Sequence, residues 1–510
     1  MLVKTYSSTL CGISSTTITI EVNLGSGVNF YLVGLPDNAV KESHQRIKAA
    51  FKNNKLKFPG REITINMAPA DLKKEGTVFD LPIAIGILSV SKQVNTSKLE
   101  EYLMIGELSL DGSVQFCKGV LPRTLQAKKE GFKGIIVPHQ NYFEATLVQG
   151  IEVIPAQSLQ SVLHFLNGTK TPELPSVPSK AVQAAQSFMD FHDVQGQYKV
   201  KRALEISAAG GHNIILIGPP GAGKSMLAKR MPGILPEMNI EEALETTTLY
   251  SVSNKVNYDG GLINKRPFRK PHHTISDVAL VGGGGIPKPG EISLAHNGIL
   301  FLDELPEYKR NALEVMRQPM EDKVVTISRA NFTMDFPANF MLLAAMNPCP
   351  CGYLNHPEKK CSCSPFQIQR YLSKVSGPLL DRIDLHVEVS PVSFADLSSN
   401  KKQESSIEIK KRVMSARTIQ RNRYRSKSIN QCNSNMTKSE MKTHCQLTTD
   451  CTALIELAMN RLNLSARAYD RILKVSRTIA DLDQKNQIER DHVGEAIQYR
   501  GLDKLKNWVN

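Results

Sequence analysis

The sequence predicts an α/β protein in three parts: an N-terminal α/β region, a central parallel sheet that binds a nucleotide, and a helical C-terminal region. Three observations lead to this prediction. The glycine-rich segment GPPGAGKS at 218–225 follows an apolar run and precedes a helical segment without a breaker. Two more apolar runs, 298–302 and 340–346, end in polar residues, as buried parallel strands do at a ligand site. From residue 407 onward the pattern is helical.

Length and composition favour several globular domains. A chain of 510 residues with 41% hydrophobic and 22% charged residues suits about three of them. We expect a domain at 1–165, a linker rich in Pro, Thr and Ser at 166–189, the nucleotide-binding core at 190–395 and the helical region at 396–510. The sequence has no apolar run that could cross a membrane and no signal-peptide pattern, so we predict a cytoplasmic protein.

The charge balance favours a polyanionic partner. The formal net charge is +14, and the segment 401–430 holds ten Lys and Arg against two Glu, a net +8. The commoner meaning of such a run is a solvated helix face, so charge alone does not assign a nucleic-acid partner.

The N-terminal region, residues 1–165, mixes strand and helix patterns. We expect strands at 17–22, 29–33, 62–67 and 134–138, helices at 39–53 and 121–131, an apolar helix after a polar loop within 72–88, and a hairpin at 105–114.

This region resembles the Lon-protease-like domain (S5 domain 2-like fold) found in Lon and in the bacterial recombination protein RadA. Aligned by its motifs, Val78 stands where the protease has its nucleophilic serine, and Pro122 stands where it has its catalytic lysine. Neither side chain can attack a peptide bond as a nucleophile, and neither can accept a proton as a base. The resemblance therefore implies a non-proteolytic scaffold, one that contacts DNA or stacks subunits.

The glycine-rich segment predicts a bound nucleoside triphosphate. Its residues are Gly218, Pro219, Pro220, Gly221, Ala222, Gly223, Lys224 and Ser225. Backbone N–H groups of such a loop surround phosphates, Lys224 reaches the outer phosphates, and the Ser225 hydroxyl can ligate Mg²⁺. The alternative is a glycine-rich turn without a ligand, which the Lys-Ser pair and the preceding strand disfavour.

Polar residues at the ends of the next two strands predict hydrolysis. Asp303 is expected to hold Mg²⁺ through water, and Glu304 to orient and polarise the attacking water. The alternative for this pair is the capping of a helix that begins at Pro306. Asn347, at the end of the third strand, is expected to bond the γ-phosphate or the attacking water.

Two segments between these strands carry basic residues that could meet DNA. The segment 266–285 is long and glycine-rich, so we interpret it as an inserted functional loop that offers Arg269 and Lys270. The segment 323–336 predicts a β-hairpin with its tip at 328–331, offering Lys323 and Arg329. The pair His272-His273 is expected to bond nearby backbone rather than a metal.

Four of the nine cysteines form a candidate metal site. Cys349 and Cys351 are separated from Cys361 and Cys363 by a short loop, and two thiolate pairs in this arrangement suit tetrahedral Zn²⁺. The alternatives are a loop of free thiols and a redox disulfide.

Two arginines complete the candidate site. Arg382, between Asp381 and Asp384, could be an ordinary ion-paired residue, or could stabilise charge at the site of a neighbouring subunit. Helices are expected at 407–425, 453–462, 465–482 and 490–499, and Arg467 would lie in the first turn after the N-cap Ser465.

These motifs stand in the order typical of an AAA+ ATPase, and longer segments resemble the ComM/YifB family of magnesium-chelatase-like AAA+ proteins. The segments are RPFRKPHHTISDVALVGGG, PKPGEISLAHNGILFLDELPE, NPCPCGY and LSARAYDRILKVSRTIADL. The resemblance implies a helix-two insertion at the long loop, a pre-sensor-one hairpin at 323–336 and a helical lid. It also implies that Asn347 is sensor one, Arg382 the arginine finger, Arg467 sensor two, and that the segment 190–197 with Val194 lines the adenine pocket.

The same resemblance implies a homo-hexamer that assembles with ATP and DNA, and a role in branch migration during recombination of incoming DNA in natural transformation. Single-stranded, double-stranded and branched DNA are the implied partners, and ATP and Mg²⁺ the cofactors. Two other functions stay open: a chelatase-like protein remodeller and an ATP-gated DNA-binding scaffold. The basic residues of the predicted pore elements favour nucleic acid over polypeptide.

Overall fold

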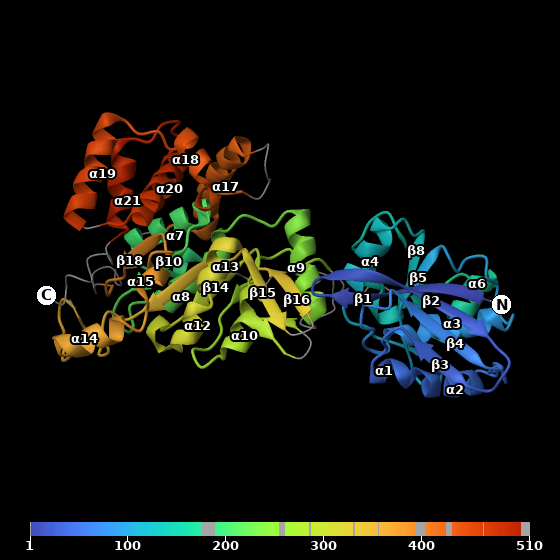
Figure 1. Ribbon diagram of the computed structural model, residues 1–510. Helices are drawn as coiled ribbons and strands as arrows, with labels where there is room; N and C mark the ends of the chain where they lie inside the picture. Colours follow the sequence, from blue (N-terminus) through green and yellow to red (C-terminus); the bar gives the residue numbers. More distant parts are fainter. Residues whose placement is uncertain are drawn as a thin grey trace. The chain divides into compact units, whose positions relative to one another are not determined.

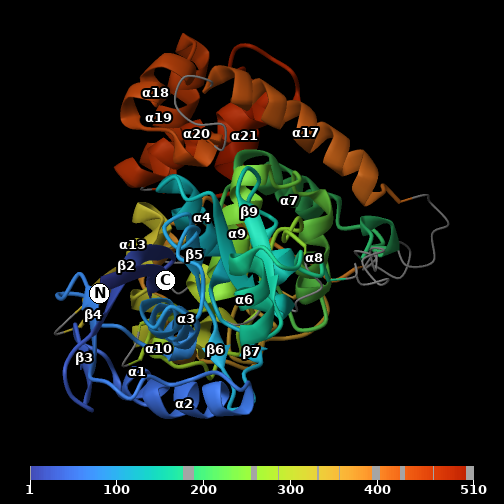
Figure 2. The ribbon, with the colours of Figure 1, turned by 90° about the vertical axis from the view of Figure 1, so that its right-hand side faces the viewer.

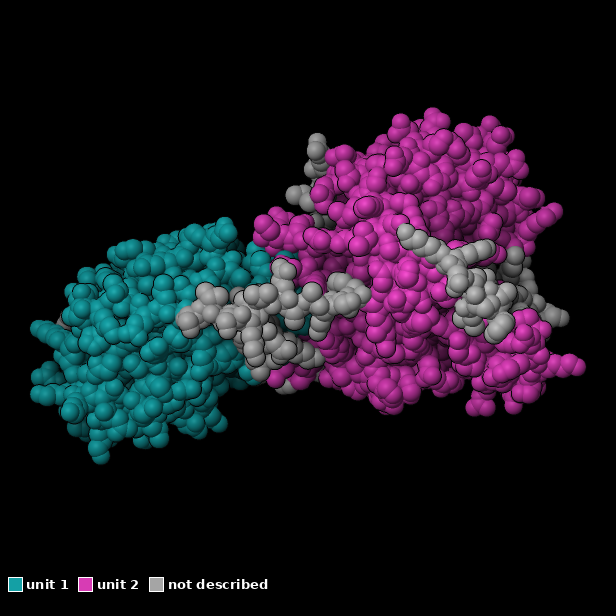
Figure 3. Space-filling view, turned by 180° about the vertical axis from the view of Figure 1, so that it is seen from behind, with its two compact units in different colours: residues 1–185, 243–263 teal, residues 186–242, 264–510 magenta. Residues whose placement is uncertain are grey.

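The computed structural model describes residues 2–175, 189–253, 261–284, 287–329, 332–354, 356–392, 403–424, 431–462 and 464–500. The chain divides into two compact units, residues 1–185 with 243–263 and residues 186–242 with 264–510 (Figure 3). Most of the predicted linker 166–189, and both ends of the basic segment 401–430, lie outside the described residues. The domain boundaries given above stay predictions.

The first unit is built on a mixed seven-stranded sheet in the order β3-β4-β2-β1-β5-β8-β9. Its strands are β1 (Leu2–Cys11), β2 (Ser14–Leu24), β3 (Phe30–Val33), β4 (Ile63–Ala68), β5 (Tyr102–Met104), β8 (Gly134–Pro138) and β9 (Glu152–Ala156). The helices are α1 (Asn38–Lys41), α2 (Ser43–Asn53), α3 (Asp80–Val90), α4 (Val120–Lys129), α5 (Tyr142–Ala145) and α6 (Leu159–Asn167). Figure 2 looks towards this unit, with α2 along its lower edge. Helix α3 is buried along its whole length, which explains its uniformly apolar sequence.

The first strand of this unit was not predicted from the sequence. β1 pairs antiparallel with β2 from Leu2↔Asn23 to Cys11↔Ser14, through a turn in which Gly12 has a φ of 65°. The buried positions of β1 include Thr5, Ser7 and Ser8 rather than a run of aliphatic residues. Thr5 Oγ1 donates to Pro82 O at 3.0 Å, whereas the buried Ser7 Oγ has no hydrogen-bond partner among the described residues. Because the inner face of β1 is polar, the strand lacks the alternation of apolar and polar residues by which strands are predicted.

Other predictions for this unit agree with the structure, with small shifts. The expected hairpin at 105–114 is present as β6 (Glu107–Leu108) paired with β7 (Val114–Gln115). The helix expected at 39–53 is divided into α1 and α2. Val78 and Pro122 are both buried among apolar residues.

The second unit contains a parallel five-stranded sheet in the order β11-β14-β17-β10-β18 (Figure 1). Its strands are β11 (Phe268–Arg269), β14 (Ile299–Leu302), β17 (Met341–Met346), β10 (Ile214–Ile217) and β18 (Leu385–Glu388). β10 comes first of these five strands in the sequence, but in the sheet it lies between β17 and β18. The three central strands are buried at every residue, so the apolar runs read from the sequence are core strands.

Helices cover this sheet and continue into the C-terminal region. The helices of this part of the chain are α7 (Tyr198–Gly210), α8 (Lys224–Arg230), α10 (Asp277–Val281), α11 (Glu291–Leu294), α12 (Arg310–Glu314), α13 (Arg317–Asp322), α14 (Pro365–Leu372) and α15 (Gly377–Leu380). Helix α9 (Ile240–Ser253) belongs mainly to the first unit from Ala243 onward. Two small two-stranded sheets complete the unit: β12 (Gly282–Gly283) with β13 (Lys288–Pro289), and β15 (Val324–Arg329) with β16 (Phe332–Pro337).

The C-terminal helices lie together, drawn in orange and red in Figure 1, and share one hydrophobic core with the sheet. They are α17 (Ser406–Arg423), α18 (Lys438–His444), α19 (Thr449–Leu462), α20 (Ala466–Leu482) and α21 (Arg490–Gln498). Ser465 caps α20 as predicted, because its side chain accepts a hydrogen bond from Ala468 N. Within the described residues, no helix has the length and apolar character needed to cross a membrane.

Candidate nucleotide-binding site

The loop 218–225 joins β10 to α8 and has the backbone of a phosphate cradle. Gly221 and Gly223 have φ angles of 80° and 88°, a region that favours glycine. A Cβ at Gly218 would lie 2.2 Å from Val389 O, so the loop passes too close to β18 for any side chain there. Helix α8 begins at Lys224, and its N-terminus therefore points its free N–H groups at the loop.

Lys224 connects the loop to the end of β17. Its Nζ donates to Gly218 O at 2.7 Å, to Pro219 O at 2.8 Å and to Asn347 Oδ1 at 3.1 Å. Burial lowers the pKa of Lys224, and the nearby carboxylates of Asp303 and Glu304 act in the opposite direction. The structure thus brings together a lysine and an asparagine that are 123 positions apart in the sequence.

Asp303, at the end of β14, faces the start of α8. Its Oδ2 accepts hydrogen bonds from Ser225 Oγ at 2.7 Å and from Lys270 Nζ at 2.9 Å. Burial alone would raise the pKa of Asp303, but the hydrogen bonds and the charge of Lys270 lower it overall. A hydroxyl and an ionised carboxylate beside a phosphate loop are ligands that Mg²⁺ prefers.

Glu304 is held in an unusual backbone conformation beside Asp303. Its φ is 54°, which costs a non-glycine residue about 1 kcal/mol and is typical of functional positions. The side chain remains 59% exposed, and Oε2 lies 3.5 Å from His273 Nδ1. A carboxylate at this edge of the sheet can reach a water molecule next to a bound phosphate.

The contact between His273 and Glu304 was missed by the sequence analysis. We expected both histidines to bond nearby backbone, and His272 does accept from Thr274 N and lies 2.9 Å from Thr274 Oγ1. His273 instead stacks against His272, with ring centroids 4.2 Å apart, and faces the carboxylate. The available signal was that His273 belongs to the inserted segment 266–285, between the phosphate loop and the strand that carries Asp303.

Three of the basic residues that we expected to face DNA have partners or are partly buried in the structure. Arg269 makes two bonds to the Glu291 carboxylate, at 2.6 and 2.8 Å, and Lys270 bonds Asp303. Lys323 ends α13 with a φ of 59° at the base of the β15–β16 hairpin, where burial lowers the pKa of its ammonium. Arg269 and Lys270 are therefore ion-paired in the structure, Lys270 with its side chain 40% exposed, and contact of these residues with DNA stays a prediction.

The fourth, Arg329, ends β15 opposite Phe332, and its side chain lies outside the described residues.

The remaining predicted site residues do not meet Lys224. Val194 is fully buried; its N–H donates to Phe191 O at 3.0 Å and its carbonyl accepts from Lys201 Nζ at 2.6 Å. Arg382 is ion-paired with Glu321 at 2.9 Å and donates to Pro378 O at 2.8 Å. Arg467 is exposed in the first turn of α20.

Both arginines belong to the edge of the sheet opposite the phosphate loop. Arg382 O accepts from Asn213 Nδ2 at 3.2 Å, and Asn213 immediately precedes β10, whereas the loop follows β10. Arg471, one helical turn after Arg467, is paired at 2.9 Å with Asp384, which immediately precedes β18. A four-residue strand spans about 13 Å, so neither arginine stands at the chain's own phosphate loop.

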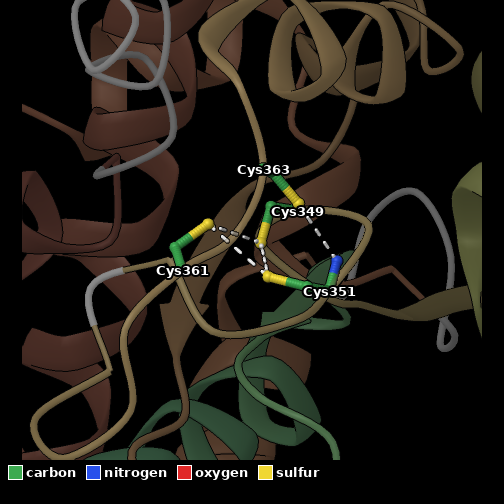
Figure 4. Close-up of side chains that lie close together, drawn as sticks. All are labelled: Cys349, Cys351, Cys361 and Cys363. Atoms are coloured by element: carbon green, nitrogen blue, oxygen red, sulfur yellow. Dashed lines mark hydrogen bonds between the residues drawn. The ribbon is translucent and has the colours of Figure 1, made fainter.

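The four clustered cysteines converge as Figure 4 shows. The Sγ atoms of Cys349, Cys351 and Cys361 lie 3.4 to 3.7 Å apart, and all four sulfurs lie within 4.8 Å of one another. Four thiolates at about 2.3 Å from a tetrahedral Zn²⁺ would be separated by about 3.8 Å. A disulfide would need about 2.05 Å, and all nine cysteines are free. The arrangement fits a metal site better than a disulfide.

Comparison with known proteins gives matches along most of the chain. The family model of magnesium chelatase, subunit ChlI, matches residues 190–397, that of subunit ChlI of Mg-chelatase matches 20–141, and that of the ChlI C-terminal region matches 403–500. Competence protein ComM of Haemophilus influenzae is 45% identical over 506 residues, covering 98% of this chain and 97% of its own length.

Two further relatives extend the comparison. The protein YifB of Escherichia coli is 44% identical over 496 residues, covering 97% of this chain and 96% of its own. Lon protease 2 of Bacillus subtilis is 31% identical over 125 residues, 24% of this chain and 22% of the protease. The similarity to Lon is therefore limited to one region of this chain.

Proposed function

This chain belongs to the ComM/YifB family of magnesium-chelatase-like AAA+ proteins, and on that basis we propose that it is an ATP-driven DNA helicase that promotes branch migration. We further propose that it acts as a homo-hexamer on incoming DNA during recombination in natural transformation. The name of the ComM relative, a competence protein, is what supports this cellular role.

The observation that supports ATP hydrolysis is the meeting of four strand-end and loop residues. Ser225 bonds Asp303, and Lys224 bonds Asn347, at the carboxyl edge of one parallel sheet. We assign Ser225 and Asp303 to Mg²⁺, which when bound would neutralise phosphate charge. Lys224 would bind the outer phosphates, Asn347 would orient the γ-phosphate, and Glu304 would accept a proton from the attacking water.

A ring of subunits is supported by the placement of Arg382 and Arg467. Each lies at the sheet edge opposite the chain's own phosphate loop, so each would serve the nucleotide of a neighbouring subunit. To contact a phosphate of the neighbouring subunit's nucleotide, Arg382 must break its ion pair with Glu321. Arg467 is already exposed. We assign Arg382 as the finger and Arg467 as the second sensor.

DNA as the substrate is supported by the net charge of +14 and by the two inserted elements, 266–285 and the β15–β16 hairpin. Arg269 and Lys270 would have to exchange their carboxylate partners for DNA phosphate, and on the hairpin Arg329 is the candidate contact. Lys270 is better assigned to the magnesium site, next to Asp303.

The decisive experiment measures strand displacement and branch migration on forked and four-way DNA with ATP. We expect the wild-type protein to convert both substrates in an ATP-dependent manner, and Lys224→Ala to be inactive because it lacks the phosphate ligand. Binding of DNA without conversion would instead support an ATP-gated scaffold. ATPase activity stimulated by an unfolded polypeptide but not by DNA would support a protein remodeller.

The cysteine cluster is proposed as a structural Zn²⁺ site. Protein purified without added zinc is expected to contain about one Zn²⁺ per chain by elemental analysis, and Cys361→Ser to lose most of it, since a structural site needs all four ligands. Cys445→Ser is the matched control, because that cysteine is buried in the helical region away from the cluster. Metal-free wild-type protein with four titratable thiols would refute the site.

A further inference from the structure

The four-cysteine loop continues directly into a helix whose outer face is not covered by the described chain. Cys363 is followed by Ser364, which caps α14 and forms a capping box with Gln367. Helix α14 rests on the protein through Ile368 and Tyr371, which are buried. We call the cysteine loop and α14, residues 349–372, the knuckle. Its helix is therefore fixed at its N-terminus by the cysteine cluster and along its inner side by packing.

The outer face of α14 presents an aromatic ring and a cation. Phe366 is 71% exposed, the highest value for an aromatic residue in the described chain. At about 100° per residue, Arg370 lies about 40° from Phe366 around the helix, and both point away from Ile368 and Tyr371. Arg370 is exposed and has no carboxylate partner among the described residues. The free face thus consists of one apolar ring beside one unpaired guanidinium.

Charge selects the kind of partner that this face would bind. Lys359, Lys360 and Arg370 outnumber Glu358 in the knuckle, although four thiolates with Zn²⁺ would add a formal charge of −2. Lys359 and Lys360 adjoin Cys361 and would offset that charge, which leaves Arg370 free to meet an anion. An exposed aromatic ring beside an unpaired arginine is the chemistry that binds single-stranded nucleic acid, by base stacking and phosphate contact.

We propose that the knuckle is a single-stranded DNA-binding element, in which Phe366 stacks on an unpaired base and Arg370 contacts an adjacent phosphate. This inference rests on the proposed DNA function and adds a contact outside the inserted loop and the hairpin.

The position of the knuckle links this contact to the nucleotide. Cys349 follows two residues after Asn347, whose Oδ1 accepts from Lys224 Nζ at 3.1 Å. A Cβ at Gly352 would lie 2.4 Å from Pro220 Cδ, so the knuckle packs directly on the phosphate loop. The cysteine loop and its helix are therefore placed to respond to a movement of the phosphate loop or of Asn347 during hydrolysis.

The test compares Phe366→Ala with wild-type protein by fluorescence anisotropy, using a labelled oligo(dT) strand and a non-hydrolysable ATP analogue. We expect Phe366→Ala to weaken binding about tenfold or more, and Phe366→Trp to retain it, because stacking needs only an aromatic ring. Arg370→Gln should reduce the slope of log affinity against log salt by about 0.7. Leu457→Ala, at a residue that is 50% exposed on α19, is the control for loss of exposed apolar surface.

The outcomes separate this inference from the proposed function. If wild-type protein binds no DNA, the proposed function fails. If wild-type protein binds and Phe366→Ala binds equally well, the knuckle is not the contact and the proposed function stands. If Phe366→Ala changes the sedimentation of the ring but not its affinity for oligo(dT), the face is an interface between copies and the inference is overturned. Circular dichroism of each variant verifies folding.

Discussion

Replacing Glu304 by glutamine is expected to reduce the steady-state rate of ATP hydrolysis at least about 100-fold while leaving nucleotide binding intact. Glutamine keeps the size and hydrogen-bonding reach of the side chain but cannot take a proton, and general-base catalysis contributes about 10² to 10⁴ in rate. The phosphate ligands Lys224 and Ser225 are unchanged, so ATP affinity should fall little. A coupled phosphate-release assay and binding of a fluorescent nucleotide measure the two quantities.

The same variant tests whether Arg382 acts across an interface. Arg382→Ala alone should also be nearly inactive, and mixing it with Glu304→Gln should restore part of the activity. In mixed rings, some interfaces combine an intact Glu304 from one subunit with an intact Arg382 from the next. Glu456→Gln is a suitable control, since that residue is exposed on α19 and has no side-chain partner among the described residues. Full ATPase activity in Glu304→Gln, or no recovery on mixing, would contradict the assignments.

The sequence was sufficient to predict which residues of the candidate nucleotide site lie together, because the ends of parallel strands share one edge of the sheet. Once 213–217, 298–302 and 340–346 are identified as parallel strands, the residues after them must share one edge of the sheet. Ser225, Asp303, Lys224 and Asn347 do meet there. The pattern of apolar runs therefore predicted contacts between residues that are more than one hundred positions apart in the sequence.

Side-chain partners that depend on loop paths could not be predicted in this way. Lys270 and His273 approach Asp303 and Glu304 because of how the inserted loop folds back, which no periodicity records. For Arg382 the sequence left an ion pair open as an alternative, but its partner Glu321, 61 positions earlier, could not be identified. The strand β1 was missed because hydroxyl residues occupy its inner face. In each case a long-range contact overrode the local pattern.

The largest effect on stability is expected at Asp481 in the helical region. This carboxylate is fully buried on α20 and accepts from Arg423 of α17 at 2.6 and 2.8 Å. It also accepts from Arg477 Nε at 3.1 Å and from Asn433 Nδ2 at 2.8 Å. One acid therefore neutralises two arginines and joins three segments of the chain.

Replacing Asp481 by asparagine should destabilise this region by about 3 to 5 kcal/mol, because it leaves two largely buried guanidinium groups without a counter-charge. Asparagine is isosteric, so the loss reports charge rather than a cavity. With urea dependence of about 1 to 3 kcal/mol per molar, the unfolding midpoint should fall by about 1 to 5 M. Circular dichroism at 222 nm follows the transition, since α17 and α20 are long helices. Asp470→Asn, on the same helix but without an ion pair among the described residues, should unfold like wild type. An equal, small shift in both variants would show that the two arginines find other partners or water when Asp481 is removed.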